Sequence, residues 1–257
     1  MSTTSGNPTE CRNCGTRLVG AFCAHCGQKA VHLNPSLHEF LQDLFQELVP
    51  VDGRILQSVR LLLKKPGLLS REYFAGRRAR YMSPILLYLA FSLLYFAISA
   101  LAPIGGWQVS CTSCVPERRA IVELHLTEAI NVWVPRTFFI LVPLFATLIA
   151  LAARRSSRNY PQHLYFAMHV HAAWFLAASI AALSGFIPYA PLRRGFSAAL
   201  VTYAGIYLIL AFRRAYDATW RTAIVRGSLV GFTYFLLTIA AVAIVVVPVL
   251  LRESGGG

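Results

Sequence analysis

The sequence predicts an all-α integral membrane protein, with a small cysteine-rich head at its N-terminus and about five transmembrane helices after it. Three observations lead to this fold class. The chain has 257 residues, of which 56% are hydrophobic and only 14% are charged, a composition typical of membrane proteins rather than soluble domains. Long apolar stretches recur after residue 83. Two closely spaced pairs of cysteines precede them.

The four N-terminal cysteines have the spacing of a metal-binding module over residues 11–30. Two residues separate Cys11 from Cys14 and Cys23 from Cys26, and a glycine follows each pair. A Cys-x-x-Cys turn brings two thiolates to one metal, and two such turns close a tetrahedral site. The sequence therefore predicts a zinc-ribbon-like head with structural Zn²⁺ and no open position for catalysis. Iron or a redox pair is the alternative for the same cysteines.

The segment at residues 36–81 predicts short amphipathic helices. Ser36 and Glu39 form a capping box for the first helix, and Pro50 ends it. The later helices carry most of the basic residues of this segment. Two roles stay open for them, packing against the base of the bundle or lying in the membrane interface. Before the head, residues 1–10 are rich in small polar side chains and predict a disordered tail.

Apolar segments predict the transmembrane bundle at residues 84–252. The expected spans are 84–102, 134–153, 164–187, 196–212 and 227–251. Each span has roughly 17–25 residues, which fits a hydrocarbon core of about 30 Å. Pro143 and Pro248 lie inside spans and predict kinks.

The distribution of basic residues predicts the orientation. With the N-terminus in the cytosol, 18 of the 24 Lys and Arg residues lie on the inner side, which agrees with the positive-inside rule and places the C-terminus outside. Reduced thiols for the metal module also require the cytosol. Arg193 and Arg194, expected in a short outer turn, run against the rule.

Several short motifs resemble the bacterial DUF3667 family. They are Cys-Arg-Asn-Cys-Gly (11–15), Phe-Cys-Ala-His-Cys-Gly-Gln-Lys (22–29), His-Glu-Phe-Leu (38–41), Lys-Lys-Pro-Gly (64–67), Arg-Glu-Tyr-Phe-Ala-Gly-Arg-Arg-Ala-Arg-Tyr (71–81) and Ser-Pro (83–84). The resemblance implies a zinc-ribbon-like head on a membrane protein of the bacterial inner membrane, and it implies no assigned activity. In the family pattern an acidic residue precedes the first histidine of the third span, whereas this chain has Gln162 there.

Histidines in the third predicted span are a candidate second site. Ionisable residues inside a membrane are costly and often functional, so His163, His169 and His171 could take part in metal, haem or proton chemistry. However, His169 and His171 point to nearly opposite sides of a regular helix, and His163 lies about 12 Å from His171 along the axis. One metal therefore cannot bind all three from this helix alone. Hydrogen bonding inside the bundle is the simpler interpretation.

The outer loop contains a third cysteine pair, Cys111 and Cys114, which predicts a local disulfide in an oxidising compartment. Neither this pair nor any other motif identifies a catalytic residue, since the chain lacks the phosphate-binding, metalloprotease and serine-hydrolase signatures.

Three functions remain open from the sequence. The first is an interaction or assembly protein whose head binds a protein partner. The second is a small transporter or permease subunit, suggested by the prolines inside spans. The third is a membrane enzyme that uses the histidine cluster. The expected partners are the lipid bilayer, with anionic headgroups at its cytosolic face, and a protein. Nucleic acid is not expected, because the head has few basic and aromatic residues.

Overall fold

The computed structural model describes residues 9–30, 33, 35–40, 54–101, 118–187 and 189–254. Regular structure in these residues is almost entirely helical, and two isolated β-bridges lie in the head. The helices are α2 (Arg54–Lys64), α3 (Leu68–Phe74), α4 (Pro84–Leu101), α5 (Arg119–Ala152), α6 (Tyr160–Leu183), the 3₁₀ turn η1 (Ser184–Phe186), α7 (Ala190–Ala215) and α8 (Trp220–Ser254). Residues 37–40 are also helical.

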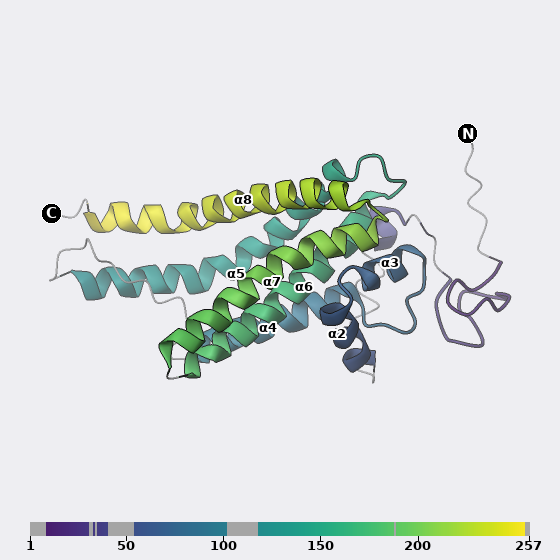
Figure 1. The fold of residues 1–257 in the computed structure, drawn as a ribbon, viewed down its shortest axis with the longest axis horizontal. Helices are drawn as coiled ribbons and strands as arrows, with labels where there is room; N and C mark the ends of the chain where they lie inside the picture. Colours follow the sequence, from purple (N-terminus) through teal and green to yellow (C-terminus); the bar gives the residue numbers. More distant parts are fainter. Residues whose placement is uncertain are drawn as a thin grey trace.

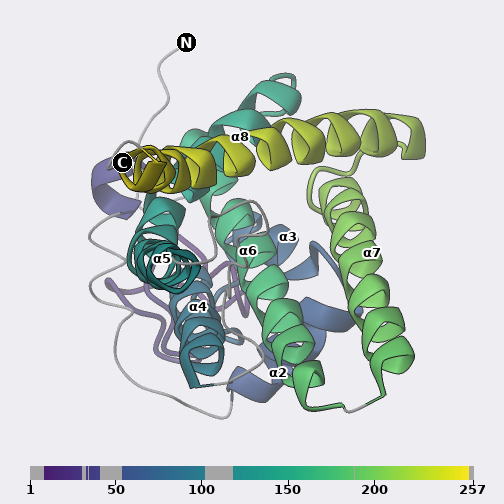
Figure 2. The same ribbon diagram turned by 90° about the vertical axis from the view of Figure 1, so that its left-hand side faces the viewer.

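The bundle consists of α4 to α8. Helices α5, α6, α7 and α8 are long and apolar enough to cross a membrane, and α4 contains a shorter apolar helix. This confirms the predicted all-α membrane fold. The five helices lie alongside one another, and α2, α3 and the N-terminal segment lie at one end of them (Figure 1). Helix α8 crosses the bundle from α7 toward α5 (Figure 2).

Three of the helices extend well beyond the predicted spans. Helix α5 begins at Arg119, far ahead of residue 134, and α8 begins at Trp220. Helix α7 begins at Ala190, so Arg193 and Arg194 lie in its first turns and not in the expected turn between spans. The apolar pattern missed these extensions because a helix can continue into water once its hydrogen-bond ladder is established. Both α5 and α8 also continue through Pro143 and Pro248.

Helix α6 is the centre of the bundle. In the most apolar stretch of α6, 61% of the residues are buried, whereas in the most apolar stretch of α8 only 6% are. Its inner face packs against α4, α5 and α7, with aromatic rings filling the space around His171 and Phe175. Helices buried on all sides are apolar on all sides, which explains why α6 lacks the one-sided pattern of a surface helix.

The α2–α3 hairpin is wedged against the end of the bundle. Its turn places Gly67 at φ 78°, and a Cβ there would lie 2.3 Å from the Ala211 carbonyl oxygen of α7. Only glycine fits both the left-handed backbone and this close approach. Arg214 donates a hydrogen bond to the Pro66 carbonyl at 2.7 Å, and Tyr203 donates one to Leu63 at 2.8 Å.

The amphipathic pattern of residues 36–81 is therefore used in part for packing. Leu62, Leu69 and Phe74 are buried in the main core. The basic residues of α2 remain exposed at the same end of the bundle, and they are Arg54, Arg60 and Lys64. The predicted tail at 1–10 lies outside the described residues, except for residues 9 and 10, which join the first hairpin of the head.

Candidate metal centre

Two similar turns build the cysteine site. In the first, the Cys11 amide donates to the Thr16 carbonyl and the Gly15 amide donates to the Cys11 carbonyl, both at 2.8 Å. The second turn repeats this pattern, with Cys23 bonded to Gln28 at 2.8 Å and Gly27 bonded to Cys23 at 2.9 Å. Both glycines have positive φ, 78° and 71°, which closes each turn tightly. A short β-bridge flanks each turn.

The turns bring the four sulfur atoms together. The Cys11 and Cys26 Sγ atoms are 3.5 Å apart, as are those of Cys14 and Cys23, and all four lie within 4.8 Å of one another. Four sulfurs at about 2.3 Å from a central Zn²⁺ would be separated by about 3.8 Å, so the arrangement fits one tetrahedral ion. Among the described residues, these cysteines are the group that can hold a metal. All four ligands come from the protein, which leaves no position for substrate.

Half-buried Cys14 and buried Cys11 differ in thiol pKa when no metal is bound. A hydrogen bond with the Thr16 side chain lowers the pKa of Cys14 to about 5. Burial raises the pKa of Cys11 to about 11. Thiolates are the metal ligands, so Cys14 would bind a metal at neutral pH without releasing a proton, whereas Cys11 would have to release one. Metal binding therefore releases protons.

Gln28 fixes the head to the membrane bundle. Its Nε2 donates to the Gly76 carbonyl at 2.8 Å, and its Oε1 accepts from the Arg78 and Ala79 amides, each at 2.9 Å. The side chain is buried and uses both of its polar ends. Gly76 is also close to the head from the other side, since a Cβ there would lie 3.2 Å from the Arg12 side chain. The loop after α3 thus serves as a socket for the second cysteine turn.

A second attachment lies at the start of α6. Asn159 and Gln162 form a capping box, and both side chains also reach the segment that follows the head. Asn159 Nδ2 donates to the Pro35 carbonyl at 2.7 Å, and Gln162 Nε2 donates to the Leu33 carbonyl at 2.9 Å. A carboxylate at 162 could cap the helix but could not donate to Leu33. The amide of Gln162 therefore has a structural role.

The three histidines of α6 have separate partners. His163 Nδ1 is 2.7 Å from the Tyr216 hydroxyl, and His169 Nδ1 is 3.0 Å from the Ser70 hydroxyl. All three rings are buried. They face different elements, as the helical geometry predicts, and they do not converge on a common point. A metal site made from them stays a prediction that would need ligands from other helices.

The third histidine has a defined tautomer. His171 Nδ1 is 2.8 Å from the Ala167 carbonyl, which can only accept, so this nitrogen carries the proton. Its Nε2 therefore accepts from the Tyr234 hydroxyl at 2.7 Å. Both ring nitrogens are used inside the bundle. In His169, by contrast, Nε2 is buried without a hydrogen-bond partner among the described residues.

One predicted cysteine pair lies elsewhere in the chain, and one residue of the site was not predicted. Cys111 and Cys114 lie outside the described residues, so their disulfide stays a prediction.

The sequence interpretation missed Gln28, although one signal was present. The two cysteine turns are near-repeats that end in Cys-Gly-Thr and Cys-Gly-Gln, so Gln28 in the second turn corresponds to Thr16 in the first. Thr16 is exposed, and the longer amide side chain of Gln28 indicates a contact that only the second turn makes.

Comparison with known families bears on the loop and hairpin that hold the head. Residues 52–96 match the DUF3667 family model, described as a protein of unknown function. This confirms the predicted resemblance over α2, α3 and most of α4. The matched segment includes the socket for Gln28 and the turn that packs on α7. No curated protein and no solved structure matches the chain.

Proposed function

We propose that the chain is a membrane-anchored interaction protein whose zinc-stabilised head binds a protein partner in the bacterial cytosol. The attachment of the head through Gln28 is the observation that carries the proposal. A head on a flexible tether would sample many directions, whereas three hydrogen bonds, two of them buried, present it in one. Pre-organised surfaces lose less entropy when they bind.

The tip between the two cysteine turns is the proposed contact surface. Val19 is 95% exposed and Phe22 is 63% exposed, and Arg17, two residues before Val19, is exposed as well. Phe and Arg are enriched at protein interfaces relative to the rest of the surface. The N-terminal segment lies beyond the end of the bundle that carries α2 and α3 (Figure 1). This position favours a partner in water over one in the lipid.

The closed metal site supports an interaction role over catalysis. Zn²⁺ held by four thiolates contributes folding energy and has no free coordination position. The transporter alternative was suggested by broken helices, but α5 and α8 are continuous at their prolines. We assign the exposed basic residues of α2 to contact with anionic headgroups of the inner membrane, with the N-terminus inside and the C-terminus outside.

A charge placed at the tip tests the proposal. Burying a Val or Phe side chain stabilises a complex by about 1.5–3 kcal/mol, so Val19→Asp/Phe22→Asp should weaken partner binding by at least a hundredfold. The readout is the size of the complex extracted from native membranes with the full chain, together with rescue of a deletion strain. Leu37→Asp, at a 54% exposed position outside the tip, is the matched control.

The expected result is loss of the large complex and of rescue in the tip variant, with one zinc retained per chain. The control should behave like the native protein. Full rescue by the tip variant, or by a chain without residues 1–30, would rule out recruitment by the head.

A further inference from the structure

Arg193 and Arg194 occupy a position that the orientation rule does not explain. They lie in the first turns of α7, beside the end of α6, on the side that the charge distribution predicts to be outer. Arg194 is exposed, and Arg193 uses one guanidinium donor for the Ile187 carbonyl at 3.4 Å. Helices α4, α6 and α7 contain no Asp or Glu, so no carboxylate from them offsets the two positive charges.

A hollow begins at these arginines. A cavity of about 540 Å³ is lined by Arg193, Arg194, Ser184 and Ser197. A second cavity of about 290 Å³ shares Ala181 and Ala182 with the first and continues between α6 and α7. The two cavities therefore adjoin along α6 and α7 and together are called the hollow below, and small alanine side chains of α6 line both.

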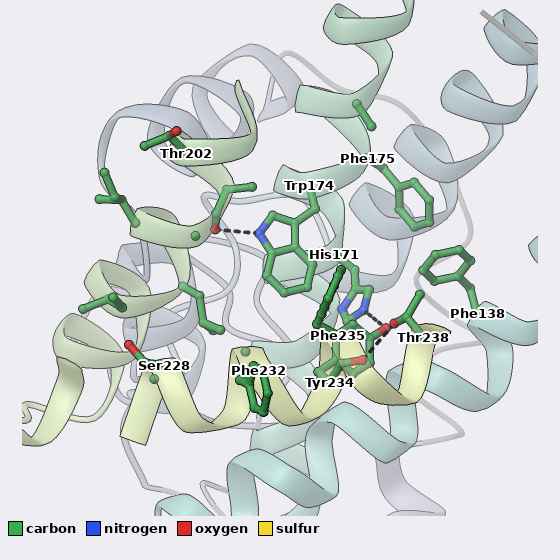
Figure 3. A pocket seen from close by; sticks show the side chains of 18 of the residues that line it. Phe138, His171, Trp174, Phe175, Thr202, Ser228, Phe232, Tyr234, Phe235 and Thr238 are labelled. Carbon is green, nitrogen blue, oxygen red and sulfur yellow. Dashed lines mark hydrogen bonds between the residues drawn. The ribbon is translucent and has the colours of Figure 1, made fainter. Parts of the chain in front are cut away.

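The second cavity adjoins a wider, apolar cavity. This cavity measures about 680 Å³ and shares Tyr95, Trp174, Ala178 and Ala204 with the second. In Figure 3, Trp174 stands between Thr202 on one side and the ring cluster of His171, Phe175 and Tyr234 on the other. Exposed lining residues of α7 and α8, such as Ile206 and Phe235, indicate that it opens at the apolar side of the bundle, which a bilayer would cover.

The polar groups that line the wide cavity are uncharged, and most of their hydrogen-bond donors already have a partner in the protein. The Trp174 Nε1 donates to Ala204 at 3.0 Å, Tyr234 donates to His171, and Thr238 donates to Tyr234 at 2.9 Å. Among the described residues, no Lys, Arg, Asp or Glu lines this cavity. The inner end therefore suits a hydrocarbon chain, and only the outer end suits an anion.

The length of the hollow fits one leaflet of a bilayer. Arg194 and Gly205 are eleven residues apart on α7, which is about 16 Å at 1.5 Å per residue. Half of a hydrocarbon core is about 15 Å. A lipid with its headgroup at the arginines would thus place the end of its chain beside Trp174 and Gly205.

We propose that the hollow between α6 and α7 binds a lipid with a phosphate headgroup and a long apolar chain, with the phosphate at Arg193 and Arg194. Guanidinium groups bind phosphate through paired hydrogen bonds. Bulk lipid is as apolar as the cavity, so chain burial alone gives little preference. Selectivity comes from the arginines. The phosphate belongs either to a two-chain bilayer lipid or to a single-chain lipid phosphate.

Trp174 reports occupancy of the chain end. The full chain, with Trp107, Trp133 and Trp220 replaced by Phe, is placed in phosphatidylcholine nanodiscs. Three brominated quenchers are compared at equal mole fraction: dibromooctadecyl phosphate, a dibrominated phosphatidic acid and dibromooctadecanol. We expect at least one phosphate probe to quench Trp174 at roughly a tenfold lower mole fraction than the alcohol. Preference for one phosphate probe identifies the single-chain or the two-chain source, and both outcomes support the proposal.

Two pairs of variants separate the headgroup and chain sites. Arg193→Gln/Arg194→Gln should remove the preference for phosphate, whereas Arg154→Gln/Arg155→Gln, an exposed pair in the loop between α5 and α6, should keep it. Gly205→Leu should lower quenching because a Cβ at Gly205 meets no atom within 4 Å and the new side chain fills the cavity.

Ala199→Leu, on an exposed face of α7, is the control for added volume. Equal quenching by the alcohol and by both phosphates would overturn the proposal. A preference for phosphate that survives loss of Arg193 and Arg194 would do so as well.

Discussion

Replacing Gln28 by alanine tests whether the head is held by the bundle. The substitution removes three hydrogen bonds and leaves the Gly76 carbonyl and the Arg78 and Ala79 amides without their buried partner. Each bond contributes about 1 kcal/mol net, so the docked state should lose about 3 kcal/mol. This corresponds to a shift of roughly a hundredfold in the equilibrium between docked and undocked heads.

Hydrogen exchange at residues 76–79 measures this shift. In the native protein the Arg78 and Ala79 amides are protected by the Gln28 oxygen, so their exchange should accelerate by up to a hundredfold in the variant. Zinc content should stay at one per chain, since the Gln28 backbone carbonyl still accepts from Cys23. Gln57→Ala, which removes an exposed glutamine from α2, is the matched control. Unchanged exchange at these amides would refute the assigned role of Gln28.

Three further substitutions test other contacts. Gly67→Ala should destabilise the bundle by about 3 kcal/mol or more, because positive φ and contact with α7 both oppose a Cβ; thermal unfolding in detergent, with Gly20→Ala as control, measures this. Gln162→Glu should keep the helix cap but lose the donor to Leu33, and protease cleavage near residue 33 should increase while unfolding of the bundle changes little. The hydrogen bond from Arg77 lowers the pKa of the Glu72 carboxyl in the folded protein. The Glu72–Arg77 pair therefore stabilises the fold fully at pH values above the ordinary pKa of a glutamate, and this stabilisation is lost as the pH falls through the lowered pKa of Glu72. Glu72→Gln should therefore make the free energy of unfolding depend less on pH in the acid range. An unchanged pH dependence would show that the Glu72–Arg77 pair does not contribute to it.

The sequence predicts local features of this chain better than contacts between distant segments. Cys11 and Cys14 follow a spacing that one metal imposes, so their proximity needs no knowledge of the rest of the fold. Apolar stretches likewise show that helices cross a membrane, but not where they end in water, and α7 therefore begins at Ala190 rather than near Phe196. No local pattern encodes which side chain meets His169.

The partner of His169 is Ser70, 99 positions away, and it comes from a helix that the amphipathic pattern left free to pack or to lie on the membrane. The same holds for Gln28, whose partners depend on the path of the chain after α3. Such pairings follow from tertiary packing, which a single sequence does not display.

The two attachments of the head are separated by different lengths of chain, and this sets an order during synthesis. The metal module is complete once residue 26 has emerged, and its socket at 76–79 follows after about fifty more residues. The contact of Leu33 with Gln162 spans 129 residues, which a ribosome adds in roughly 6–26 s at 5–20 residues per second. A nascent chain therefore has all four cysteines of the head before the start of α6 exists to bind the segment that follows the head.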